Sequence, residues 1–308
     1  MTGNRPLEVL LAGAEPILMG VLNVTPDSFS DGGLVSAGGV QEVRAIQRGL
    51  ELQRQGAAII DVGGEASSFH RPGIHPIPPD EQICRVVPII RGLRRSAAGE
   101  RLWLSIDTRS AVVARAALHA GADIINDISA GTQDGEMFAL AAEHRCPIIL
   151  MHHRPEPPGI MPEPYSDVVG EVRRYLLARA AAAMAQGVKR ERIVLDTGLG
   201  FGKTVGDNWK LLGGVAEFVG TGYPVALGAS RKRFLTAITG EPVSTPGGPG
   251  LLVSAVPGAT ATQVHWHARD LATALVTVLA AACGVRVHRV HNVALAAQAL
   301  AVVRAAGA

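Results

Sequence analysis

The chain has 308 residues, of which 47% are hydrophobic and 18% charged, so it can bury a sizeable core in one large domain or two ordinary ones. The formal net charge is only +2, with Arg and Lys scattered, which argues against a nucleic-acid face or a polybasic membrane surface. No apolar run reaches the roughly 20 residues of a membrane span, and residues 1–15 lack the apolar centre of a signal peptide.

Three cysteines, Cys84, Cys146 and Cys283, lie within apolar helix or strand patterns. Their odd number favours free thiols in a reducing compartment, so we expect a cytoplasmic protein. The chain contains no Cys-x-x-Cys pair and no His-Glu-x-x-His motif, so a zinc site has no support.

Short apolar runs alternate with longer Ala-rich stretches along the chain. The expected strands are residues 17–22, 58–62, 102–106, 123–126, 148–151, 193–195, 225–227 and 285–290. Most are apolar on both faces, which is typical of parallel strands covered on both sides. The clearest helical patterns are residues 40–55, 111–119, 137–143, 168–186 and 271–282, and the Ala-rich residues 295–308 also favour a helix.

Eight strands, most of them followed by a helical segment, predict an α/β fold with a single (β/α)8 TIM barrel. The barrel domain would span residues 16–308, after an N-terminal extension at 1–15. Residues 240–263, rich in Pro and Gly, are expected to form a long insertion after strand seven. A doubly wound open sheet is the alternative, weakened because no dinucleotide-binding glycine fingerprint follows the first strand.

Each expected strand delivers a polar group at or near its C-terminal end, and in a barrel these ends meet on one face. In strand order the groups are Asn23, Asp61 with Glu65 just beyond, Asp107, Asn126 and Asp127, His152, Asp196, Ser230 with Lys232, and Arg289 with His291. A single strand-end Asp is often a structural cap. Eight such positions together favour one active site.

The chemistry of these groups falls into two kinds. Acceptors that would match the amino group and ring N–H of a flat heterocycle are Asp107, Asn126 and Asp196. Cations that would hold a carbonyl or phosphates are Lys232, Arg289 and His291. The neutral Asn23 could help to bind a Mg²⁺ that is otherwise ligated by phosphate oxygens and water.

A glycine-rich stretch, "DTGLGFGKT", follows the sixth strand at residues 196–204. Its glycines alternate, so the spacing of a nucleotide-binding phosphate loop is absent, although the composition is similar. The alternative is a tight turn that lets the backbone approach a planar ligand.

The motifs "MGVLNVTPDSFSDGG", "DVGGE", "SIDT", "IINDISAG", "ILMHH", "LDTGLGFGKT", "GASRKRFL" and "RVHNV" resemble, in the same order, those of the dihydropteroate synthase family. The resemblance covers residues 17 to about 292. It implies a barrel enzyme of folate biosynthesis that condenses 6-hydroxymethyl-7,8-dihydropterin pyrophosphate with p-aminobenzoate, giving 7,8-dihydropteroate and pyrophosphate. It also implies a Mg²⁺ cofactor and a homodimer, with small-molecule substrates and no nucleic-acid or membrane partner.

The resemblance also implies roles for individual residues. Those implied to be catalytic are Asp107, Lys232, Arg289 and His291, with Asn23 at the Mg²⁺ and pyrophosphate. Those implied to bind substrate are Asn126, Asp196, Met151, Phe201, Gly228, Val290, Ser230, Phe29, Ser68, Arg71 and Pro72. Ser230 resembles the site of the benzoate carboxylate, at the start of a helix after strand seven. Residues 25–33 and 65–73 resemble two mobile loops that close over the substrates.

The implied mechanism is dissociative, because an electron-rich dihydropterin can support positive charge once pyrophosphate leaves. The attacking aryl amine is already neutral and nucleophilic, so no activated Ser or Cys is required. Catalysis would then depend on stabilising the leaving group and on excluding water.

Two departures from the family pattern leave alternatives open. The second loop, "GGEASSFHRPG", is two residues longer than the family's usual G-G-E-S-T-R-P-G, with Phe69 and His70 added and with Ser67 and Ser68 competing for one Thr position. We expect Phe69 to narrow the p-aminobenzoate pocket and alter discrimination among p-aminobenzoate and its sulfonamide mimics, or the insertion to be a tolerated loop change. Asn292 stands where the family commonly has Asp. A non-catalytic pterin-binding paralogue and a pterin-dependent methyltransferase remain the alternative functions.

Overall fold

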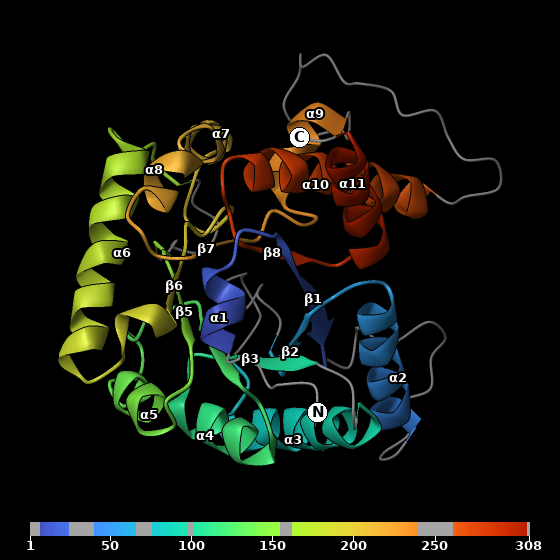
Figure 1. Ribbon diagram of the computed structural model, residues 1–308, viewed down its shortest axis with the longest axis vertical. Helices are drawn as coiled ribbons and strands as arrows, with labels where there is room; N and C mark the ends of the chain where they lie inside the picture. Colours follow the sequence, from blue (N-terminus) through green and yellow to red (C-terminus); the bar gives the residue numbers. More distant parts are fainter. Residues whose placement is uncertain are drawn as a thin grey trace.

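The computed structural model describes residues 7–24, 40–65, 76–97, 102–154, 162–239 and 261–306. Its eight strands form a closed barrel in the order β1 to β8, and every neighbouring pair is parallel (Figure 1). Because β1 pairs with β8, an open doubly wound sheet is ruled out and the predicted (β/α)8 barrel is confirmed.

The strands are β1 (Ile17–Asn23), β2 (Ile59–Gly63), β3 (Trp103–Asp107), β4 (Ile124–Asp127), β5 (Ile148–Met151), β6 (Ile193–Asp196), β7 (Val225–Leu227) and β8 (Val287–Val290). Several of them extend one residue further than the apolar pattern predicted. At Asn23, Asp107 and Asp196 the polar residue itself ends the strand, because its backbone still aligns with the neighbouring strand. These three side chains are therefore held by the sheet and not by loops.

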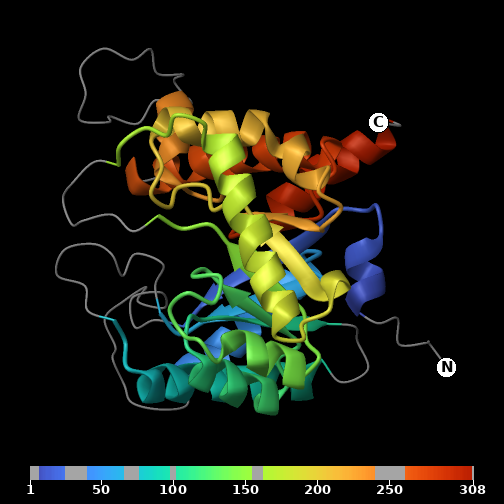
Figure 2. The ribbon, with the colours of Figure 1, turned by 90° about the vertical axis from the view of Figure 1, so that its left-hand side faces the viewer.

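The helices are α1 (Leu7–Ala12), α2 (Val40–Arg54), α3 (Pro79–Ser96), α4 (Ala111–Ala120), α5 (Met137–Glu143), α6 (Val168–Ala185), α7 (Val205–Gly213), α8 (Val215–Val219), α9 (Thr236–Thr239), α10 (Ala261–Ala282) and α11 (Val293–Ala305). In both views α3 and α4 lie along one side of the barrel, with α10 and α11 opposite (Figures 1 and 2). None of the described helices is long and apolar enough to cross a membrane.

Several helices differ from the sequence-based expectation: α1, α3, α7 and α8 were not among the clear patterns, and α10 begins earlier than expected. Helix α3 was not among the clear patterns, since Pro88 interrupts its helical period, although Pro at its first turn and arginines in its last turn are typical helix signals. Helix α10 begins at Ala261, ten residues earlier than expected and inside the predicted insertion. The rest of that insertion, residues 240–260, lies outside the described residues.

Alternation along the strands creates the site. One buried apolar cluster fills the barrel interior, formed by Leu11, Ile17, Met19, Ile59, Ile124, Ile149, Val194, Ala226 and Val287. Intervening residues such as Ile60 and Leu195 pack outward against the helices. Because side chains repeat with a period of two, the next inward positions are Asp61, Asn126, Asp196 and Arg289. A polar layer thus lies directly above the apolar one.

Helix α1, within the expected N-terminal extension, lies across one end of the barrel (Figure 1). Leu10 and Leu11 pack on the interior cluster, and the Arg286 guanidinium donates to the carbonyl oxygens of both residues. This end is therefore closed by apolar contacts and backbone hydrogen bonds, so the polar layer faces the opposite end.

Candidate functional site

Arg289 is the centre of the polar layer. Its Nε donates to Asp61 Oδ2 over 2.6 Å, and its Nη2 donates to Asp107 Oδ2 over 2.8 Å. Asn126 Nδ2 donates to the same Asp61 oxygen over 3.0 Å. Four strands, β2, β3, β4 and β8, are thereby joined through buried side chains at the C-terminal ends of the strands.

The other half of the site comes from β5, β6 and the turn after β7. Asp196 Oδ1 accepts from Gly198 N over 2.7 Å, and Lys232 donates to the Leu199 carbonyl. The Lys232 ammonium also lies 4.3 Å from the centre of the Phe201 ring. Phe201 packs with Met151 and Ile128 in a small apolar cluster. A cation and a flat apolar surface are thus presented together, as a polar heterocycle requires.

Gly228 explains how the two halves approach each other. A Cβ atom at this position would lie 3.8 Å from Arg289 Cβ and 3.9 Å from Lys232 Nζ. Any side chain longer than Ala would therefore occupy the space between these two cations.

The charges of both halves act on one another. The pKa of Lys232 is lowered to about 7, because burial disfavours its charge and Arg289 adds to this effect, while Asp196 and Asp107 oppose it. Burial raises the pKa of Asp107 to about 7 against the attraction of Arg289, and the negative charge of Asp61 contributes. Burial also raises the pKa of Asp196, which Lys232 opposes. The predicted pterin-binding residues thus form one electrostatic unit.

His291 does not carry the positive charge expected from the sequence. Burial, followed by the nearby charges of Arg231 and Arg289, lowers its pKa to about 3, so the ring is neutral near pH 7. Its Nδ1 lies 2.9 Å from Ser230 Oγ, and its backbone N–H donates to the same oxygen over 3.1 Å. His291 is therefore a neutral hydrogen-bonding group coupled to Ser230.

Ser230 also differs from its expected setting. It lies in a turn before the short 3-10 segment Arg233–Leu235 and the four-residue α9, and not at the start of a long helix. A helix dipole at Ser230 is consequently small, and anion binding there would depend on side chains and individual N–H groups.

The turn that carries Ser230 is held by its neighbours. Arg231, with a φ of 59°, donates from Nε and Nη2 to the two oxygens of Asp270 over 2.7 and 2.9 Å. Asn292 Nδ2 donates to Asp270 over 3.2 Å, while its Oδ1 accepts from Leu295 N and caps α11. An Asp at position 292 would cap the helix equally well but would face the Asp270 carboxylate. The Asn is therefore explained by its neighbour.

Asn23 ends β1 beside the polar layer. Its Oδ1 is buried and has no hydrogen-bond partner among the residues that the structure describes. Within the same ranges, no group of three or more His, Cys, Asp or Glu side chains is placed to hold a metal by itself. A lone buried amide oxygen fits a cation whose other ligands come from phosphate and water.

Comparison with known proteins gives this arrangement a family. The model of pterin binding enzymes matches residues 19–291. The dihydropteroate synthase of Mycobacterium leprae is 43% identical over 291 residues, covering 94% of this chain and 92% of its own. The chain belongs to the dihydropteroate synthase family of pterin-binding enzymes.

Solved structures agree with this family assignment. Dihydropteroate synthase of Xanthomonas albilineans with 4-aminobenzoic acid is 37% identical, with a TM-score of 0.77 over 95% of this chain and 93% of its own. The same enzyme in complex with 7,8-dihydropteroate is 35% identical, with a TM-score of 0.76 over 95% and 94%. As a dihydropteroate synthase family member the chain is a transferase of folate biosynthesis, and the methyltransferase alternative loses its support.

Some residues that the dihydropteroate synthase resemblance implied are not brought to this cluster. Val290 points away from it and packs in the core between the barrel and its helices. Four further residues, together with the inserted Phe69 and His70, lie outside the described residues: Phe29, Ser68, Arg71 and Pro72. The expected effect of Phe69 on sulfonamides stays a prediction.

Two residues to which the sequence analysis gave no role are central. Asp61 was noted only as a strand-end carboxylate, yet it is fully buried and holds both Arg289 and Asn126. Lys203 is buried, and its Nζ donates to the carbonyl oxygens of Gly198 and Phe201 over 2.8 and 2.9 Å. The lysine of "GFGKT" thus fixes the glycine-rich turn that presents Phe201, instead of facing a phosphate.

Proposed function

We propose that this site condenses 6-hydroxymethyl-7,8-dihydropterin pyrophosphate with p-aminobenzoate, as the family resemblance implies. The observation that carries the proposal is the electrostatic unit of Asp107, Asp196 and Lys232 around Arg289. The carboxylates accept from the amino group and ring N–H of the pterin, and Lys232 donates to its carbonyl. Phe201 and Met151 supply the apolar surface beside the ring.

The reaction breaks the bond between the pterin methylene carbon and the pyrophosphate oxygen, and the aryl amine nitrogen then bonds to that carbon and loses a proton. Arg289 is held by two carboxylates before substrate binds, so its position costs little reorganisation when charge develops on the leaving group. Ser230 and the neutral His291 add hydrogen-bonding groups without adding charge.

Turnover of the two substrates tests the proposal. Pyrophosphate release and dihydropteroate formation are measured for the wild type and for D107N, with R115M as a control, since Arg115 pairs with Glu143 on the exposed helical surface. We expect wild-type turnover, loss of about 100-fold or more in D107N, and no change in R115M. Pterin binding without pyrophosphate release would instead indicate a non-catalytic paralogue.

We further propose that Mg²⁺ binds with pyrophosphate at Asn23. When bound, the ion would neutralise the leaving group, and the buried Asn23 Oδ1 supports the assignment because it otherwise has no partner in the described part of the chain. Calorimetric titration with pyrophosphate should show tighter binding with Mg²⁺ than without it. N23A should remove that difference and leave the metal-independent binding unchanged. An unaltered Mg²⁺ effect in N23A would exclude this residue.

The homodimer is also a proposal, with α10 as its interface. Leu271, Leu275 and Leu279 recur every four residues and are 45%, 58% and 60% exposed, and residues 271–282 contain no charged side chain. A second copy of the same uncharged face would cover this stripe. Sedimentation equilibrium should give a dimer for the wild type and a monomer for L275K. A wild-type monomer at micromolar concentration contradicts the proposal.

A further inference from the structure

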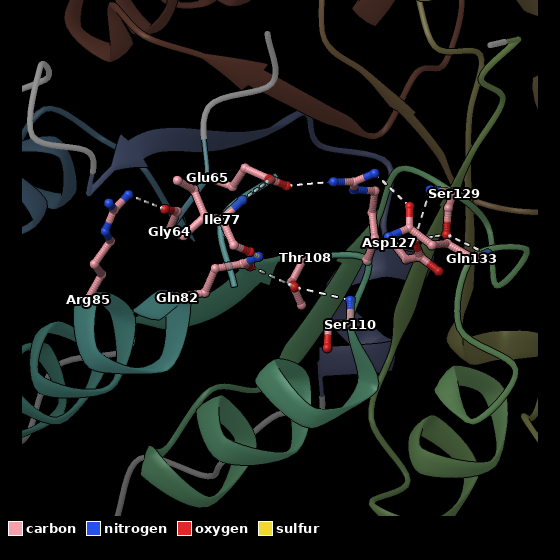
Figure 3. Close-up of polar contacts among 11 residues, drawn as sticks. Gly64, Glu65, Ile77, Gln82, Arg85, Thr108, Ser110, Asp127, Ser129 and Gln133 are labelled. Carbon is pink, nitrogen blue, oxygen red and sulfur yellow. Dashed lines mark hydrogen bonds and ion pairs between the residues drawn. The ribbon is translucent and has the colours of Figure 1, made fainter. Parts of the chain in front are cut away.

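Glu65 begins the connection between β2 and α3, and both of its carboxylate oxygens are engaged. Oε1 accepts from the backbone N–H of Ile77 over 2.9 Å, twelve positions along the chain, and Oε2 accepts from Arg109 Nη2 over 2.7 Å (Figure 3). The Glu65 and Arg109 side chains are only 12% and 13% exposed, so this ion pair is shielded from water. One carboxylate thus ties together the two described ends of the connection.

Arg109 extends the link to a third loop. Its second nitrogen, Nη1, donates to Gln133 Oε1 over 2.6 Å. Glu65, Arg109 and Gln133 lie in three consecutive connections, after β2, β3 and β4. The fork of one guanidinium therefore holds these loops in register, which the single ammonium of a lysine cannot do.

Neighbouring contacts hold the described residues on both sides of the clasp. Arg85 of α3 donates to the Gly64 carbonyl over 2.9 Å, and Gln82 Nε2 donates to the Ile77 carbonyl over 2.8 Å. On the far side, Asp127 accepts from both the N–H and the hydroxyl of Ser129, over 2.8 and 2.6 Å (Figure 3). The backbone N–H of Gln133 in turn donates to Ser129 Oγ over 3.4 Å, so both partners of Arg109 have a further contact with the fold.

The strands β2 and β3 are therefore tied at two depths. The deeper tie runs from Asp61 through Arg289 to Asp107, and it belongs to the pterin side of the site. The upper tie is Glu65 to Arg109, four residues beyond Asp61 and two beyond Asp107. The two ties have no hydrogen bond in common, although the charge of Glu65 contributes to the raised pKa of Asp107.

We propose that Glu65 and Arg109 are positioning residues for p-aminobenzoate and not for the pterin. This inference rests on the proposed function: with the pterin held by the polar layer and the opposite end of the barrel closed by α1, p-aminobenzoate reaches the reacting carbon from the rim. The clasp sets the separation of residues 65 and 77 and joins residues from three rim connections, while Arg289 holds Asp107 through separate hydrogen bonds.

The test separates the two substrates. In R109M we expect the KM for p-aminobenzoate to rise about tenfold, because a rim displaced by a fraction of an ångström no longer aligns the amine. The Kd of 6-hydroxymethyl-7,8-dihydropterin pyrophosphate, titrated without p-aminobenzoate, should stay within about twofold of wild type. R115M, which removes the exposed Arg115–Glu143 pair, should change neither value.

Conservative variants complete the design. R109K keeps a positive charge beside Glu65 but loses the second N–H donor that reaches Gln133. Its KM for p-aminobenzoate should therefore lie between those of wild type and R109M. E65Q keeps an acceptor for Ile77 N–H while removing the charge that holds Arg109. Because that charge also raises the pKa of Asp107, both constants are measured at about pH 8, where Asp107 is ionised with or without it. There E65Q should reproduce the selective rise in the KM for p-aminobenzoate even if R109M does not fold. The inference would be overturned if the KM for p-aminobenzoate and the Kd of the pterin substrate changed equally, or if neither changed. An inactive wild type would instead overturn the proposed function.

Discussion

Arg289 on β8 and Asp61 on β2 form a buried ion pair with an Nε–Oδ2 distance of 2.6 Å, between residues 228 positions apart in the chain. Because Arg289 also donates to Asp107, it neutralises two carboxylates that would otherwise repel each other. The charge balance of the catalytic face therefore depends on Asp61, which is not among the groups we assign to substrate binding.

Replacing Asp61 with Asn should move the pH dependence of catalysis. The negative charge of Asp61 raises the pKa of Asp107, so its removal lowers that pKa and shifts the acid limb of kcat/KM for the pterin substrate to lower pH, by about one unit. We also expect a loss of about 3 kcal/mol in unfolding free energy, since one partner of a buried pair is removed. The control is D123N, which disrupts the Arg94–Asp123 pair at the N-terminal end of β4, away from the site. It should leave the acid limb of the kcat/KM profile unchanged.

The wild-type enzyme should have a narrow pH optimum near neutrality. Asp107 must be ionised to accept from the pterin and Lys232 must be protonated to donate, and both pKa values lie at about 7. As the two groups interact, the limbs belong to the pair. In K232R the alkaline limb should disappear, because arginine stays protonated. Measuring kcat/KM from about pH 5.5 to about pH 9 would reveal this, and a retained alkaline limb would exclude Lys232 as its source.

Lys203→Met should loosen the turn that presents Phe201. Three carbonyl oxygens, of His152, Gly198 and Phe201, lose their shared donor in a buried place. We expect about 3 kcal/mol less unfolding free energy and about tenfold weaker pterin binding. Urea unfolding and pterin titration provide the measurements. K210M, on the exposed face of α7, should behave as wild type in both.

Three histidines with lowered pKa values should make the fold sensitive to acid. Burial lowers the pKa of His152 and His291 to about 3 and that of His288 to about 4, from an ordinary value of 6.5. Protons then bind preferentially to the unfolded chain, so this stability is complete above pH 6.5 and falls as the pH drops toward 4. Between about pH 6 and pH 4 the slope should approach roughly 4 kcal/mol per pH unit. H288Q should reduce the slope of unfolding free energy against pH by about one third. An unchanged slope would show that the histidines are not its source.

Much of the fold could be predicted because two-sided apolar runs mark parallel barrel strands. The ends of β1, β3 and β6 were placed one residue short, since Asn23, Asp107 and Asp196 are polar although they continue the sheet. Helix α3 escaped attention because Pro88 lies within it. The local pattern of residue types thus indicated where most strands lie, but not the residue at which each one ends.

The sequence could name several side chains that the fold brings together, but not how they pair. Strand-end positions and family motifs indicated Asp107, Asn126 and Lys232. The partnership of Asp61 with Arg289 depends on barrel closure, which brings distant strands together. The neutral state of His291 depends on burial, and no sequence motif reports burial directly.

Barrel closure also orders the assembly of the chain. The carbonyl oxygens of α1 are held by Arg286, which lies 276 positions after Leu10 and just before β8. Helix α1 is therefore synthesised long before the residues next to β8 that hold it, and its docking is complete only after they have been made. Its apolar face, Leu10 and Leu11, must wait uncovered through most of translation, which is the interval in which a chaperone would bind it.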